Sequence, residues 1–70
     1  MIVRVNRQSG FELYECDGIR MREMDVNLVE FRLFSLESNQ ERELVTLEID
    51  ENSQVYIMNN AGQTITKYYL

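Results

Sequence analysis

The side chains that most often perform enzymatic chemistry are scarce in this sequence. Histidine, the commonest general acid or base, is absent, so no imidazole can activate the hydroxyl groups of Ser9, Ser35, Ser38 and Ser53. The single cysteine, Cys16, lies between Glu15 and Asp17, whose negative charges oppose formation of the reactive thiolate. We therefore interpret Cys16 as a small, partly buried apolar side chain, and we expect the protein not to be an enzyme.

Sites for metals, nucleotides and other cofactors are missing in the same way. A structural zinc site needs several thiolate or imidazole ligands, and one thiol is available. The oxygen-rich segment 50–53 lacks the spacing of an EF-hand loop, so we interpret it as a solvated turn. No glycine-rich loop exists to cradle a phosphate. Carboxylates are plentiful, but so short a chain rarely forms a substrate cleft of about 300 Å³ beside its core. We expect no cofactor, no metal and no catalytic residue.

The charge of the chain bears on its partners. The net charge is −5, and residues 36–70 contribute −4 of it, from six acidic and two basic residues. An acidic surface repels phosphate backbones, so direct nucleic-acid binding is disfavoured and a basic-surfaced protein is the expected partner. A different interpretation makes the acidic region 37–51 a mimic of nucleic acid.

Short segments of alternating apolar and polar residues, separated by turn residues, run along the whole chain. This pattern predicts antiparallel strands at residues 1–6, 11–16, 19–24, 27–36, 42–50, 54–59 and 63–70. We expect one domain, residues 1–70, that is an all-β meander forming a curled sheet, a small barrel or a two-layer sandwich. The segment 25–37 also fits a helix capped by Asp25, and in that alternative the fold is α+β.

Turn residues predict how these strands pair. The dipeptide Asp17-Gly18 suits a two-residue type I′ turn, which places Cys16 opposite Ile19. Later loops, centred on Gln40, at 51–53 and at 60–62, predict that Leu33 pairs with Leu47, Ile49 with Val55, and Ile57 with Ile65. The resulting core consists of the apolar residues that share one face, namely Val29, Phe31, Leu33, Val45, Leu47, Ile49, Val55, Ile57 and Ile65.

The opposite face of the later strands carries a second set of large apolar residues, namely Phe34, Leu36, Leu44, Tyr56, Met58, Tyr68 and Leu70. Either strands 1–24 cover these residues as a second layer, or they form an exposed contact surface, because monomers seldom leave such patches bare. The aromatic C-terminal strand would also offer an edge for strand addition. Nearby acids that would rim the contact surface are Glu41, Glu43 and Glu48.

The sequence therefore predicts a small acidic protein-binding module, of the kind with which phages and mobile elements inhibit host proteins. A structural subunit that homo-oligomerises is the alternative from a different class. No apolar run approaches the about 20 residues of a membrane span, and residues 1–7 lack the apolar core of a secretory signal. With one cysteine in the chain, a cytoplasmic location is expected.

Overall fold

The computed structural model describes residues 1–69, and this part of the chain contains strands and no helix. The strands are β1 (Ile2–Arg7), β2 (Gly10–Glu15), β3 (Gly18–Asp25), β4 (Leu28–Glu37), β5 (Gln40–Asp50), β6 (Gln54–Met58) and β7 (Thr64–Tyr68). The all-β prediction is confirmed. The alternative helix at 25–37 is wrong: Val29, Phe31 and Leu33 are buried at every second position, as β-branched and aromatic residues are in a strand.

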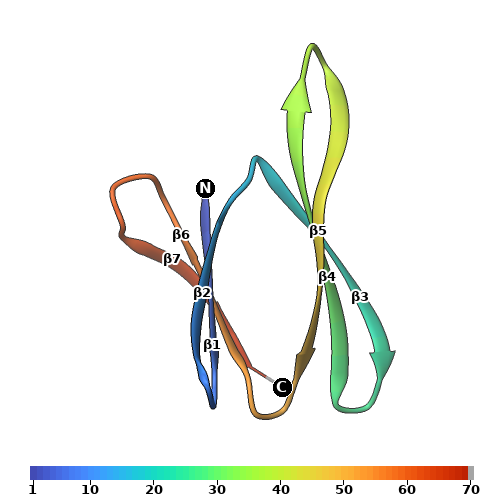
Figure 1. Cartoon of the computed structure of the whole chain (residues 1–70), viewed down its shortest axis with the longest axis vertical. Helices are drawn as coiled ribbons and strands as arrows, with labels where there is room; N and C mark the ends of the chain where they lie inside the picture. Colours follow the sequence, from blue (N-terminus) through green and yellow to red (C-terminus); the bar gives the residue numbers. More distant parts are fainter. Residues whose placement is uncertain (70) are drawn as a thin grey trace.

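The strands form two antiparallel sheets that face each other across the core, as Figure 1 shows. Sheet A has the strand order β2-β1-β6-β7, and sheet B has the order β3-β4-β5. Of the three architectures expected from the sequence, the two-layer sandwich is the one present. The side chains buried between the sheets are Val3, Val5, Cys16, Val29, Phe31, Leu33, Leu47, Ile49 and Val55.

The hairpin predicted at Asp17-Gly18 is wrong. Strands β2 and β3 belong to different sheets, and residues 16–17 form the corner between them. There, Asp17 N–H donates to the carbonyl oxygen of Phe34 at 2.9 Å, so Cys16 does not face Ile19. Gly18 has no positive φ; its missing side chain instead makes room for the Phe34 ring, since a Cβ atom there would lie 2.2 Å from Cζ.

Two later pairings also differ from the prediction. Residues 51–53 cross from sheet B to sheet A, so Ile49 and Val55 share the core without pairing. Strands β4 and β5 do form a hairpin, but its turn is Ser38-Asn39, where φ is 50° and 64°. This turn, together with a bulge between Leu33 and Phe34, pairs Leu33 with Val45. This shift of two residues keeps the same side chains on the core face, because side chains in a strand alternate with period two.

The pairing of β6 with β7 has a larger consequence. A bulge between Ile57 and Met58 pairs Ile57 with Thr66 instead of Ile65. A shift of one residue exchanges the two faces of a strand. Ile65 is therefore 63% exposed and not in the core, and Tyr68 packs against Phe31, with ring centroids 5.2 Å apart.

Candidate interaction surfaces

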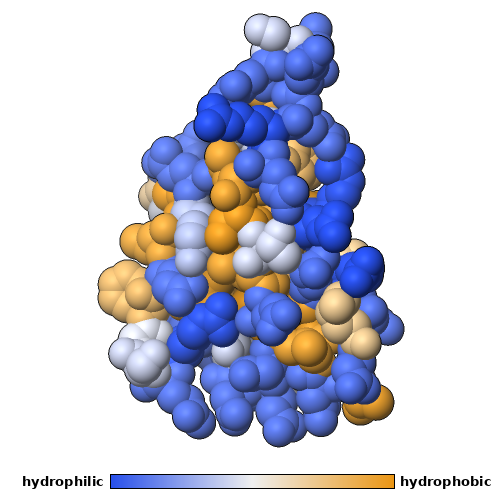
Figure 2. Space-filling model, turned by 45° about the vertical axis from the view of Figure 1, so that its right-hand side comes forward, coloured by the Kyte–Doolittle hydropathy of each residue, from blue (hydrophilic) through white to orange (hydrophobic). Residues whose placement is uncertain are grey.

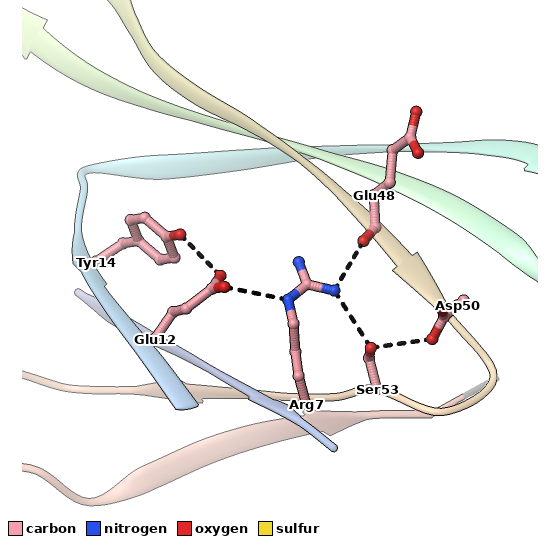
Figure 3. A network of polar contacts seen from close by, with 6 residues as sticks. All are labelled: Arg7, Glu12, Tyr14, Glu48, Asp50 and Ser53. Carbon is pink, nitrogen blue, oxygen red and sulfur yellow. Dashed lines mark hydrogen bonds and ion pairs between the residues drawn. The ribbon is translucent and has the colours of Figure 1, made fainter. Parts of the chain in front are cut away.

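The densest group of polar side chains joins the two sheets at one end of the sandwich, as Figure 3 shows. Arg7 on β1 donates through Nη1 to the carbonyl oxygen of Glu48 on β5, at 3.2 Å, and to Ser53 Oγ, at 3.3 Å. Its Nε donates to the carboxylate of Glu12 at 3.2 Å. Because each acceptor belongs to a different segment, Arg7 fastens β1 and β2 of sheet A to β5 of sheet B.

Tyr14 completes this group without adding a reactive function. Its hydroxyl donates to Glu12 Oε1 at 2.8 Å. Burial, together with the hydrogen bond and the charge of Glu12, raises the pKa of Tyr14. The hydroxyl therefore stays protonated at neutral pH, and the carboxylate that accepts from it is also held by Arg7. The group has the properties of a structural clamp.

We predict that Arg7→Ala lowers the free energy of unfolding by about 2 kcal/mol, because several charge-assisted hydrogen bonds are lost and their acceptors stay partly buried. Urea denaturation followed by circular dichroism measures the change. The matched control is Arg22→Ala on β3, whose guanidinium contacts only Met24 Sδ by hydrogen bond within residues 1–69. We expect that control to change stability by less than about 0.5 kcal/mol. Equal effects of the two substitutions would contradict the clamp.

A hollow of about 370 Å³ lies beside the corner between β2 and β3, lined by Met1, Glu15, Cys16, Asp17, Ser35 and Asn60. Burial raises the pKa of the Cys16 thiol, and the charge of Asp17 raises it further. The thiol therefore stays protonated and is a poor nucleophile at neutral pH. In the described part of the chain, no group of three metal-ligating side chains is present, and no helix is long and apolar enough to cross a membrane.

Alkylation of Cys16 should be at least about tenfold slower in the folded protein than in urea at the same pH, since only the thiolate reacts. Mass spectrometry of iodoacetamide-treated samples measures both rates. Equal alkylation rates would overturn the prediction.

The raised pKa of Cys16 also affects how stability depends on pH. Because the pKa of the thiol is higher in the folded protein than its ordinary value of 9.0, the thiol contributes its full stabilisation below pH 9.0. This contribution is lost as the pH rises through the pKa of the folded state. Cys16→Ala should remove this part of the loss of stability at alkaline pH.

The residues predicted to bind a partner do not form one patch. Three of them lie on the projecting end of the β4–β5 hairpin, namely Leu36, Glu41 and Glu43, and two lie at its base, Phe34 and Leu44. Two lie on the outer face of sheet A: Tyr56 and Met58. The others are separate, because Tyr68 packs against the core, Glu48 is exposed on β5, and Leu70 lies outside the described residues.

The first surface is a hairpin arm, which we define as residues 35–43. Strand β3 stops pairing with β4 at Phe34, so beyond that residue β4 and β5 pair only with each other. Figure 1 shows this arm extending past the sandwich. Leu36 on the arm is 55% exposed and Leu44 at its base is 47% exposed. In Figure 2 the narrow projecting end is hydrophilic, and apolar surface is exposed directly below it.

Contacts at its base hold the arm in place. The Arg20 guanidinium donates two hydrogen bonds of 2.6 Å to the carboxylate of Glu41 and lies 4.7 Å from the centre of the Phe34 ring. The hydrogen bonds from Arg20 lower the pKa of Glu41. The backbone N–H of Leu36 donates to Asp17 Oδ2 at 2.7 Å. The arm is therefore braced by β3 and by the corner before it.

The second surface is the outer face of sheet A. Its central row crosses all four strands, in the order Leu13, Arg4, Tyr56 and Lys67. Phe11 extends the face on β2 and is 57% exposed. Sequence reasoning missed Phe11 and Leu13 because it paired β2 with β3. Leu13 and Phe11 pair with Arg4 and Asn6 of β1, which point outward because Val3 and Val5 are buried.

The two cations of this face lie over aromatic rings. The Arg4 guanidinium is 4.2 Å from the centre of the Phe11 ring, and Lys67 Nζ is 5.8 Å from that of Tyr56. Within residues 1–69, neither Arg4 nor Lys67 has a carboxylate oxygen within 4.0 Å. Ion pairs of that length are made by Arg7, Arg20, Arg32 and Arg42. The outer face of sheet A is therefore apolar and positively charged, on a chain that is acidic as a whole.

No family model, curated protein or solved structure matches this chain.

Proposed function

We propose that this protein is a small protein-binding module that docks through the hairpin arm onto a partner with a basic surface. The observation that carries the proposal is the exposure of Leu36 and Leu44 on a projecting, acidic hairpin. The arm holds three acidic residues, Glu37, Glu41 and Glu43, against one basic residue, Arg42. Apolar anchors rimmed by charge of one sign are typical of surfaces that select a partner of opposite charge.

The backbone of the arm supports the same function. Strand β5 is an edge strand of sheet B, and β4 has no neighbour other than β5 beyond Phe34. The edge of β5 therefore offers unpaired N–H and C=O groups to a strand of another chain. On the β4 edge, the N–H of Leu36 is already bonded to Asp17. Strand addition of this kind supplies affinity through backbone hydrogen bonds and selectivity through side-chain contacts.

The brace formed by Arg20, Asp17 and Phe34 favours binding for a further reason. An arm that is ordered before it meets a partner loses less conformational entropy on binding. An inhibitor would use such an arm to cover the working surface of a basic target, and this narrower role is part of the proposal because of the small size and the charge of the chain.

The test is a pull-down from lysate of the source cells, at 0.15 M and 1 M salt, with the double variant Leu36→Ser/Leu44→Ser beside the wild type. The control is Val26→Ser, a residue that is 86% exposed in the turn after β3. We expect one stoichiometric partner that Val26→Ser retains, that the double variant binds at least about tenfold more weakly, and that high salt weakens. Circular dichroism checks that all three proteins are folded.

Two results would overturn the proposal. Partner binding that the double variant leaves unchanged would remove the arm from the interface. A discrete homo-oligomer in light scattering, dissolved by the double variant and with no partner captured, would instead favour the structural-subunit function.

A further inference from the structure

The outer faces of the two sheets differ in chemistry. Three of the four arginines of sheet B, namely Arg20, Arg32 and Arg42, pair with acids of the same sheet, whereas Arg22 contacts Met24 Sδ. Such a face is typical of a surface that stays in contact with water. Among residues 1–69, strand pairing places one acid on the outer face of sheet A. This acid is Glu15, at a corner of the face. The remaining positions on this face are apolar, aromatic, uncharged or cationic.

We propose that the outer face of sheet A is a second docking surface, which binds an extended acidic segment of a partner protein. Covering Arg4 and Lys67 with a purely apolar partner would bury two charges without compensation, which is costly. An occupant therefore has to bring carboxylates for the cations and apolar side chains for Phe11, Leu13 and Tyr56. This inference does not depend on the arm, because the two surfaces lie on different sheets and carry opposite charge.

The side chain of Arg4 is arranged to receive a carboxylate. Its Nε donates to Asn6 Oδ1 at 2.9 Å, and its guanidinium is stacked on the Phe11 ring. Neither Nη atom hydrogen-bonds to another of residues 1–69. The free pair of Nη donors has the planar fork geometry that matches a carboxylate. Because stacking fixes the side chain in advance, little rotamer freedom is lost on binding.

The size of the face fits a segment better than a whole domain. Strands of five or six residues, at about 3.4 Å per residue and about 4.8 Å apart, give a face of about 300–400 Å². A stable interface between folded proteins needs about 800 Å² on each side. One extended segment of about six residues is about 20 Å long and would span the central row from Leu13 to Lys67.

Charge argues against two other occupants. A second copy placed face to face would bring Arg4 and Lys67 near the same cations of its partner. A nucleic acid would meet two cations on a chain of net charge −5, and two phosphate contacts release few of the counterions that drive binding to nucleic acids.

The test is an NMR titration of the ¹⁵N-labelled full chain with two capped hexapeptides, one alternating Leu and Glu and the other Leu and Lys. We expect the Leu/Glu peptide to shift the amide signals of Arg4, Leu13 and Tyr56 in a saturable manner, and the Leu/Lys peptide to bind at least about tenfold more weakly. Arg4→Glu should abolish the shifts. Arg22→Glu makes the same charge change on β3 and should retain them. Should Arg4→Glu fail to fold, Arg4→Gln replaces it, with an expected loss of at least about fivefold.

Several outcomes would overturn the inference. These are equal binding of both peptides, shifts confined to the arm, and full binding to the folded Arg4 variant. Tighter binding of a ten-nucleotide oligothymidylate than of the Leu/Glu peptide would assign the face to nucleic acid. Shifts of the same signals with protein concentration alone would assign it to a second copy.

Discussion

Replacing Phe31 by alanine should lower the free energy of unfolding by about 4 kcal/mol, which is most of the stability of so small a domain. The side chain is fully buried in β4, the central strand of sheet B, and its ring meets that of Tyr68 from sheet A edge to face. Its loss would leave a cavity between the two sheets. Thermal and urea unfolding followed by circular dichroism measure the effect.

Phe11→Ala is the matched control for that experiment. It removes the same atoms from an outer face, where the ring is 57% exposed, and we expect a loss below about 1 kcal/mol. The two substitutions should therefore differ several-fold in effect. Similar losses at the two positions would show that the core does not lie between the sheets.

Gly18→Ala should destabilise the protein by about 2 kcal/mol, because the new methyl group would overlap the Phe34 ring, with Cβ 2.2 Å from Cζ. Gly18 and Phe34 are direct partners on β3 and β4, and an aromatic ring over a glycine is a recognised way to stabilise a sheet. The displaced ring would also leave its contact with Arg20.

The sign of this effect should reverse when the ring is absent. In a Phe34→Ala background, Gly18→Ala should raise the stability by a few tenths of a kcal/mol or more, because alanine is more favourable than glycine inside a strand and no clash remains. A double-mutant cycle from urea denaturation measures the coupling energy, which we expect to be about 2 kcal/mol. Additive effects would contradict a direct contact between Gly18 and Phe34.

The strands could be predicted from the sequence because alternation is a local property. Val29, Phe31 and Leu33 indicate a buried strand wherever that strand finally pairs. The choice of sheet partner is not local. Asp17-Gly18 fits a tight turn, but β2 pairs with β1, which pairs on its other side with the distant β6, and β3 belongs to the other sheet.

The candidate surfaces were predictable to a lesser degree for the same reason. Leu36 and Leu44 lie on one hairpin whose two strands are adjacent in sequence, so their exposure was predictable, whereas the projection of the arm past β3 was not. The face built around Arg4 depends on the distant pairing of β1 with β6. The bulge that turns Ile65 outward and Tyr68 inward inserts one residue, and no turn residue in the sequence marks it.

The position of β1 at the centre of sheet A has a consequence for how the chain acquires its structure during synthesis. Sheet B is built from consecutive strands and can form as soon as residues 18–50 are available. Sheet A cannot, because one edge of β1 stays unpaired until residues 54–58 leave the ribosome. Closing a contact across so many residues is slow compared with forming a hairpin. We therefore expect the first strand to be made early and to join the native fold late, with its bare edge open to aggregation in the meantime.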